Sequence, residues 1–287
     1  MPKIRRSVKQ AAGAISVLTF FVLVFYGLFN YGFWDPFFHE LLNLALIAAI
    51  LPPMILDTLD YRWRSAIDRA LPRFLEGIAH AQLTGLPLLR AFKEAGEGVT
   101  GPLRDEIRLM MAKISWGMKF EDALRMFMER ADTPLARRVA TLIIEANRSG
   151  GVIERIFTPL AQATSTFQAM EEERKAQLKP YVLITYISFV IFLIIVYVLY
   201  TSFFVPLTGL TAMGGFGVVV LPPMLCWVLL YHMGLVLGIF SGLIAGALGE
   251  GRVMGGLKHV VVMLTLAFLV FREMIVPGWL WALLGLA

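Results

Sequence analysis

The feature that most constrains this chain is a set of five long apolar segments. Each approaches the roughly 20 residues that a helix needs to cross a membrane. Hydrophobic residues make up 58% of the 287 residues and charged residues 16%, and mean hydropathy is +0.71; soluble domains have roughly 45–50% and 25%. We therefore expect an all-α polytopic membrane protein with about five transmembrane helices. The expected spans are residues 11–31, 37–56, 181–203, 226–248 and 259–271, the last extended toward 275.

The distribution of lysine and arginine predicts how these spans are oriented. Four basic residues precede the first span, so the N-terminus is expected in the cytoplasm. The connections then alternate between segments without lysine or arginine, at 32–40 and 204–225, and basic segments, at 60–70 and 249–259. The former are expected outside and the latter inside, with Arg272 as the exception.

Residues 57–179 differ from the rest of the chain in being highly charged. They hold 19 of the 26 Lys+Arg and 17 of the 21 Asp+Glu, and they read as helical throughout. We expect an N-terminal basic segment with two spans at 1–56, an inserted cytoplasmic six-helix bundle at 57–179, and about three further spans at 180–287. The near-balanced charge of the bundle argues against nucleic acid as a partner.

A short pattern recurs three times in this bundle. GLPLLRAF, GMKFEDAL and GGVIERIF begin at Gly85, Gly117 and Gly150, and each places apolar residues three, six and seven positions after the glycine. A left-handed glycine ends many helices, so each copy is predicted to close one helix and open the next, which gives three hairpins. The period of 32–33 residues also occurs in tetratricopeptide arrays, whose Trp, Tyr and Pro pattern is missing here. So loose a pattern can also arise by chance.

Capping residues mark individual bundle helices. Thr133 is expected as an N-cap, with Pro134 at the first helical position. Another helix opens near Pro102, and Glu106 in its early turns suits the positive end of the helix dipole. The last bundle helix, about 152–179, runs toward the third span. It either transmits motion into the membrane or simply enters the membrane there.

The sequence offers no constellation for catalysis. Residues 96–101, GEGVTG, fit a dinucleotide fingerprint but follow a helical segment instead of the strand that this motif needs, and no Walker A loop exists. The apolar span cores carry no acidic or basic residue, with Glu40 near an edge, which weighs against a coupled transporter or ion channel. We expect no enzyme activity, no cofactor and no metal. Four histidines lack metal-binding spacing and are expected as isolated interfacial residues: His39, His80, His232 and His259.

Small residues recur in the fourth span. Gly238, Gly242 and Gly246 lie four residues apart, a spacing that lets helices approach closely. We predict that this face packs against a helix, either within the fold or in another chain.

The order of these parts resembles the platform proteins of type IV pilus-like machines. These form the F-component family of type II secretion, with relatives in tight-adherence secretion, pilus assembly and the archaellum. GLPLLRAF and GMKFEDAL look like the glycine turns of that family's six-helix bundle. EANRSGGVIERIFTPLA resembles its glutamate–glycine turn, matched here by Glu145, Gly150 and Gly151. Residues 240–263 resemble the C-terminal region of the archaeal branch.

The resemblance implies a multi-pass platform in the cell membrane that couples a hexameric secretion ATPase to the assembly of pilin-like subunits. Many family members carry two such cytoplasmic domains and this chain has one, which implies a homodimer or a sister platform protein. Exposed charges near the turns would be the ATPase contact, although each is also compatible with an ordinary solvated helix face. They are Arg104, Arg108, Lys119, Arg137, Arg138 and Arg148.

The alternative is a permease-type transporter subunit. Such a protein needs a functional cavity and polar groups near the middle of the membrane, which the apolar span sequences do not offer. A signalling membrane protein would need a sensor domain, for which the outer connections are too short.

Overall fold

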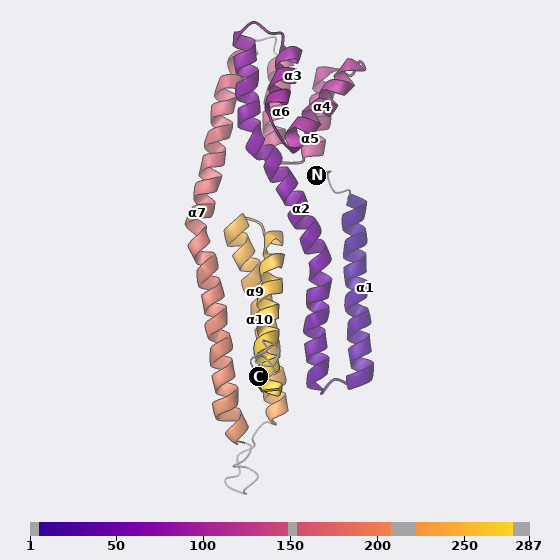
Figure 1. Ribbon diagram of the computed structural model, residues 1–287, viewed down its shortest axis with the longest axis vertical. Helices are drawn as coiled ribbons and strands as arrows, with labels where there is room; N and C mark the ends of the chain where they lie inside the picture. The colour runs from indigo at the N-terminus through magenta and orange to yellow at the C-terminus, as the bar shows by residue number, and fades with distance from the viewer. Residues whose placement is uncertain (1–5, 149–153, 208–221, 278–287) are drawn as a thin grey trace. The chain divides into compact units, whose positions relative to one another are not determined.

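The computed structural model describes residues 6–148, 154–207 and 222–277. The described residues form nine α-helices joined by short connections, which confirms the all-α prediction (Figure 1). A π-helical turn, Tyr200–Phe204, follows α7, and a 3₁₀ turn, Met254–Gly256, precedes α10. The α-helices are α1 (Arg6–Tyr31), α2 (Pro36–Leu83), α3 (Leu88–Gly98), α4 (Pro102–Ser115), α5 (Phe120–Ala131), α6 (Pro134–Arg148), α7 (Glu154–Leu199), α9 (Pro223–Glu250) and α10 (Leu257–Ile275).

Five of these helices, α1, α2, α7, α9 and α10, are long and apolar enough to cross a membrane, which confirms the five predicted spans by length and composition. Two of them continue far beyond their apolar segments, since α2 has 48 residues and α7 has 46. In both cases the span and the adjoining bundle helix are one helix, despite Pro52 and Pro53 in α2 and Pro180 in α7.

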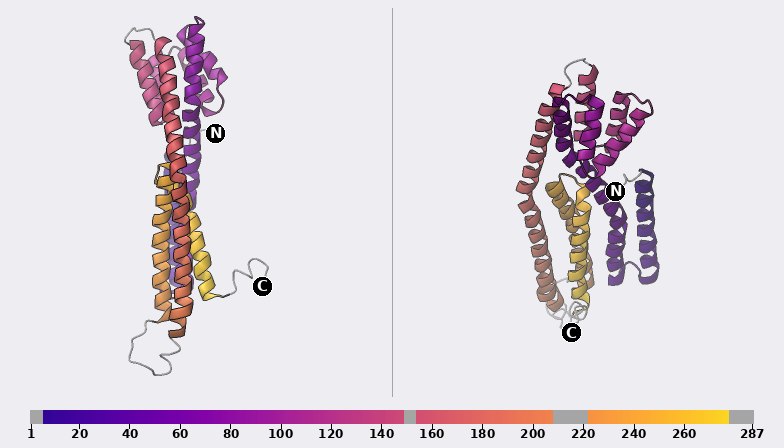
Figure 2. Two further views of the ribbon diagram at one scale, coloured as in Figure 1. Left: turned by 90° about the vertical axis from the view of Figure 1, so that its left-hand side faces the viewer. Right: turned by 45° about the horizontal axis from the view of Figure 1, so that its top comes forward.

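The chain divides into two compact units. Unit 1 contains Thr58–Arg174, and unit 2 contains Arg5–Asp57 and Lys175–Ala287. Helices α2 and α7 each contribute residues to both units. Two further views show that the long helices of unit 2 run along a common direction (Figure 2).

Unit 1 is built around one apolar core. Six helices contribute to it: the second half of α2, then α3 to α6, and the first part of α7. Phe92 lies at its centre, with its ring centroid 5.5 Å from that of Phe74, 5.2 Å from that of Phe120 and 5.9 Å from that of Phe157. Since these rings come from four helices, the core joins distant parts of the unit.

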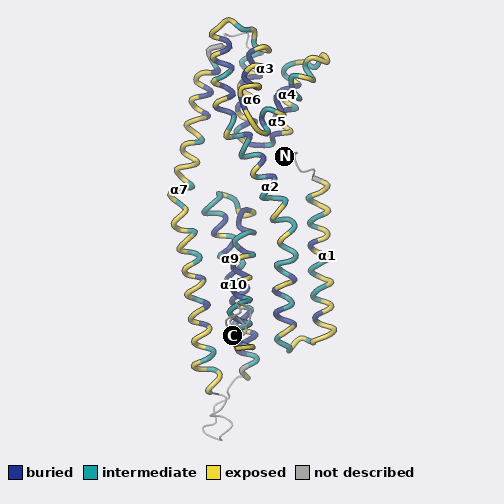
Figure 3. The backbone as a smooth tube through the Cα atoms, viewed as in Figure 1, coloured by how far each residue is buried: buried dark blue, intermediate teal, exposed yellow. Residues whose placement is uncertain are grey.

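Unit 2 has a separate core formed by α7, α9 and α10, against which part of α2 packs. Trp227 and Tyr231 stack with ring centroids 4.8 Å apart, and the Phe271 ring meets Tyr231 edge-on. Within their most apolar windows 39% of α9 and of α10 is buried, against 11% of α1. Helix α1 therefore presents most of its apolar surface outward (Figure 3), as a lipid-facing helix does.

One expectation about polar residues in unit 2 is wrong. His39 is not an isolated interfacial residue: it is fully buried, and its ring centroid lies 5.0 Å from that of His232. Glu40, in the first turns of α2, is buried in an ion pair with Arg272. Packing of α2 against α9 and α10 brings these residues together. Because they lie far apart in the sequence, no local pattern indicates that they meet. In the described residues, no group of three potential ligands could hold a metal ion.

Candidate functional site

Gly85 and Gly117 lie in two turns of the same geometry. Their φ angles are +83° and +94°. In each turn the glycine N–H donates to the carbonyl three residues earlier, and the next N–H donates to the carbonyl five residues earlier, over 2.8 and 3.2 Å at Gly85 and 2.9 and 3.1 Å at Gly117. This is the Schellman motif, which satisfies carbonyls at a helix end. The predicted third turn, at Gly150 and Gly151, lies outside the described residues.

The residues six and seven positions after each of the two described turn glycines enter the core of unit 1. Ala91 and Phe92, and in the second copy Ala123 and Leu124, are at most 2% exposed. In the third copy Phe157 is fully buried and contacts Phe92. The two described turns thus form hairpins whose apolar positions meet in one core, and Phe157 of the third copy packs in the same core.

Gly117→Ala is expected to destabilise unit 1 by about 1–2 kcal/mol, because an L-residue in the left-handed region places Cβ too close to the following carbonyl. The matched control is Gly98→Ala, since Gly98 is helical and a Cβ there meets nothing within 4 Å. That change is expected to be neutral or stabilising by up to about 1 kcal/mol. Thermal unfolding of the full chain in detergent measures both, and equal midpoints would contradict the turn assignment.

The glycine turns share one end of unit 1 with exposed apolar side chains. Consecutive helices run antiparallel, so the turns at Gly85 and Gly117 lie at the same end as the last residues of α6 (Figure 1). Leu83 and Trp116 precede these glycines and are each 80% exposed, and the Lys113 ammonium lies 5.2 Å from the centroid of the Trp116 ring. Sequence reasoning missed both residues. The available signal was an apolar residue one or two positions before a capping glycine, at a position that does not follow the helical spacing of the buried residues.

Two of the six candidate contact residues are held by acidic neighbours. Arg148 lies 3.1 Å from Glu121 and 3.7 Å from Glu145, between nitrogen and carboxylate oxygen, and Arg137 lies 3.6 Å from Asp132. Glu145, predicted as part of a glycine turn, is thus an exposed residue of α6 paired with Arg148. A partner would have to compete with these pairs.

The other four candidates differ in exposure. The Arg138 guanidinium lies 5.9 Å from the centroid of the Phe167 ring. Arg104 is half-buried, and its Nε has no hydrogen-bond partner within the described part of the chain. Arg108 and Lys119 are exposed, so their charges are available to another molecule.

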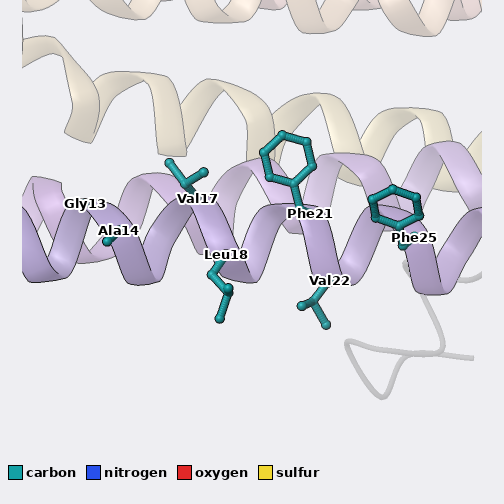
Figure 4. Close-up of a pocket in the computed structure, with 7 residues that line it drawn as sticks. All are labelled: Gly13, Ala14, Val17, Leu18, Phe21, Val22 and Phe25. Carbon is teal, nitrogen blue, oxygen red and sulfur yellow. The ribbon is translucent and has the colours of Figure 1, made fainter.

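The surface of the described residues has several hollows, of which two are relevant here. One lies between α3 and α4, where Lys93, Glu97, Arg108 and Ser115 surround an apolar floor. The other follows one face of α1 (Figure 4). Because it offers apolar side chains of a single helix, it has the character of a lipid-facing surface and provides no group to recognise a polar ligand. It is lined by Gly13, Ala14, Val17, Leu18, Phe21, Val22 and Phe25.

At the opposite end of unit 1, Thr133 joins α2 to α6. Its Oγ1 accepts a hydrogen bond from the Ala136 N–H over 3.1 Å, which confirms Thr133 as the N-cap of the helix that begins at Pro134. The same hydroxyl donates to Asp68 Oδ1 over 2.6 Å. Asp68 lies beyond the apolar segment of α2. Burial raises the pKa of its carboxyl, and the Thr133 hydrogen bond and the Arg64 charge oppose that shift.

Glu106 has a partner that the sequence did not predict. Its side chain is 7% exposed and accepts two hydrogen bonds from Arg130, over 2.6 and 2.9 Å. These bonds raise the pKa of the Arg130 guanidinium. A buried carboxylate needs a charged partner. Since Glu106 lies in α4 and Arg130 in α5, their ion pair connects the two helices.

The small residues of α9 lie against the chain's own backbone. A Cβ added at Gly242 would lie 2.5 Å from the Val260 nitrogen, and one added at Gly246 would lie 2.0 Å from the Gly256 nitrogen. At Gly238 the nearest atom, at 3.2 Å, belongs to a phenylalanine ring of α7. Within this chain, then, these glycines face α10, the 3₁₀ turn before it and α7.

Comparison with known families gives one match. The family model described as type II secretion system (T2SS), protein F matches residues 74–201. These residues include α3 to α6, both described glycine turns and most of α7. The match covers a little under half of the chain, so the similarity to protein F concerns this domain alone.

Among curated proteins, the "Uncharacterized protein MJ1286" of Methanocaldococcus jannaschii is 25% identical over 233 residues. The alignment covers 81% of this chain and 38% of the relative, so the chain spans well under half of the relative's length. No solved structure matches the chain. The similarity supports a distant archaeal relationship.

Proposed function

We propose that this chain, whose residues 74–201 form a domain of the T2SS protein F family, is a platform protein of a type IV pilus-like assembly or secretion machine. The family match carries the proposal, because it joins the glycine-turn hairpins and the apolar segment of α7 in one domain. Five helices able to cross a membrane agree with a platform in the cell membrane.

In this proposal, residues 57–179 are the cytoplasmic bundle, and residues 1–56 and 180–287 are the membrane parts. The lysine and arginine distribution supports a cytoplasmic N-terminus. The proposed partners are a hexameric secretion ATPase at the bundle, pilin-like subunits beside the spans, and a second copy or a sister platform protein. Much of the uncharged outer connection, 208–221, lies outside the described residues.

Helices α2 and α7 supply the mechanical link that a platform needs. Each is a single helix that contributes to both units. Because rigid secondary elements carry displacement over long distances, a movement imposed on the bundle would continue into two spans. The ATPase would supply the free energy of ATP hydrolysis, and α2 and α7 of this chain would transmit the resulting movement as rigid helices.

We place the ATPase contact at the end of unit 1 that carries the glycine turns. Trp116 offers an exposed aromatic anchor, and Arg108 and Lys119 offer exposed positive charge. Tryptophan, tyrosine and arginine are enriched among the residues that dominate binding energy at interfaces. Arg137 and Arg148 are weaker candidates, because acidic neighbours already hold them.

A photo-crosslinking amino acid placed at Trp116 of the full chain is expected to capture a secretion-type ATPase in native membranes. The control site is Arg73, an exposed residue of α2 outside the proposed contact. Charge reversal by Lys119→Glu should reduce recovery of the ATPase severalfold without lowering the unfolding temperature, since Lys119 is exposed.

The possible outcomes of the crosslinking experiment distinguish a wrong contact surface from a wrong function. Equal capture at positions 116 and 73 would show that the contact surface is wrong while the platform role stands. Recovery of a nucleotide-binding transporter subunit or a solute-binding protein, with no secretion ATPase at either site, would overturn the platform role.

One observation favours the permease alternative. Unit 2 contains buried polar side chains, among them Glu40, which pairs with the partly buried Arg272, and transporters use groups of this kind. Neither of the two hollows described above is lined by these residues. The same crosslinking experiment decides between the two roles.

A further inference from the structure

A cluster of polar side chains lies buried in unit 2, where α2 meets α9 and α10. It contains His39, Glu40 and Asn43 from α2, and Trp227 and Tyr231 from α9, each at most 5% exposed. It is embedded among apolar residues of helices that can cross a membrane. Nothing in the platform mechanism above uses it.

Part of the cluster is satisfied within the protein. Arg272 of α10 forms the ion pair with Glu40, and its guanidinium lies 5.3 Å from the centroid of the Phe37 ring. Asn43 Nδ2 donates to the Leu264 carbonyl over 3.2 Å. These contacts tie the first turns of α2 to α10 through polar groups.

Six other buried atoms in the cluster have no hydrogen-bond partner among the described residues. They include both ring nitrogens of His39, whose ring lies near the Phe33 backbone without meeting hydrogen-bond geometry, and the Tyr231 hydroxyl, which faces Asn43 in the same way. Buried polar groups are almost always satisfied, and the requirement is stricter in hydrocarbon, where no bulk water can compensate. So dense a concentration points to a ligand. The remaining atoms are Glu40 Oε1, Asn43 Oδ1, Trp227 Nε1 and Tyr231 Oη.

The chemistry of these atoms selects the class of ligand. Trp227 Nε1 can only donate and the oxygens of Glu40 and Asn43 can only accept, whereas the imidazole and the phenol can do both. An anion would face the Glu40 carboxylate, and the described residues form no metal-binding group. A small neutral molecule that donates and accepts hydrogen bonds in every direction fits the set, and water is that molecule.

We propose that this cluster is a water-binding site inside the membrane unit, with ordered waters bridging α2 to α9 and α10. The contact of α2 with its neighbours is then a hydrated polar seam instead of dry apolar packing. His232 lies at its margin: its Nδ1 is 2.8 Å from the Val228 carbonyl, which leaves Nε2 facing away from that bond. The proposal is independent of the platform role.

Hydroxyl-radical footprinting of the full chain tests the site, because radicals formed from bound water oxidise buried side chains next to it. Trp227 is expected to be oxidised severalfold faster than Trp63, a tryptophan 5% exposed in the core of unit 1. Phe271, a fully buried apolar neighbour of Tyr231, should stay protected. Its protection shows that the reaction does not proceed through unfolding of unit 2.

A double variant tests whether the oxidation of Trp227 depends on the polar residues of the cluster. His39→Phe combined with Asn43→Leu removes three of the six unpartnered atoms and should lower the oxidation of Trp227 toward that of Trp63. The wild-type comparison stands alone if this variant fails to fold. Equal oxidation of Trp227 and Trp63 in the wild type would overturn the proposal. Oxidation seen in purified protein but absent in native membranes would overturn it in favour of a polar group from another molecule.

Discussion

Gly246→Ala is expected to destabilise unit 2 by at least about 3 kcal/mol, at the upper end of the cost of overpacking a core. The added Cβ would lie 2.0 Å from the Gly256 nitrogen and 2.1 Å from its Cα. These are backbone atoms, so no side-chain rotation can relieve the clash. Helix α9 must separate from the turn before α10, and the packing of the whole core between them is lost.

Two other glycine-to-alanine variants, with smaller expected effects, serve as controls for this prediction. Gly13→Ala on α1 adds the same methyl group where nothing lies within 4 Å, and it should be neutral or slightly stabilising. Gly238→Ala meets a phenylalanine ring at 3.2 Å, which can shift, so its effect should be intermediate. Thermal unfolding in detergent, followed by circular dichroism, measures all three. If Gly246→Ala unfolds at the same temperature as Gly13→Ala, the close approach of α9 to its neighbours is wrong.

Arg130→Met is expected to destabilise unit 1 by about 3 kcal/mol, because it leaves the buried Glu106 carboxylate without its partner. Glu106 is 7% exposed, whereas Arg130 is 44% exposed. The reverse change, Glu106→Gln, should therefore cost less, since the guanidinium it leaves behind can reach water. Denaturant unfolding of the full chain measures both variants.

The double variant Glu106→Leu with Arg130→Met tests whether the unpaired Glu106 carboxylate is the cause of the instability of Arg130→Met. Replacing both members of a buried pair by apolar residues is often neutral, so the double variant should recover most of the stability lost by Arg130→Met. A double variant as unstable as Arg130→Met alone would show that packing, and not the unpaired carboxylate, sets the cost.

Much of the bundle's local structure could be predicted from sequence. Capping by Thr133 and the left-handed glycines at 85 and 117 depend on residues within one turn of each other, so their geometry is encoded locally. The same holds for the buried face of α4, where Ile107 and Met110 enter the core as their spacing indicates. The exposed Trp116 was missed, because a periodic pattern reports the buried face and says little about a helix end.

The sequence by itself determined the five spans, the charged middle and the repeated turns, because hydrophobic length, charge and glycine conformation act over short stretches of chain. The tertiary structure alone decided which polar residues meet. Glu40 and Arg272 are 232 positions apart, and Glu106 and Arg130 are 24 apart on different helices. Each of the two carboxylates looks like a surface residue until helix packing removes its water, and burial then makes the basic partner necessary.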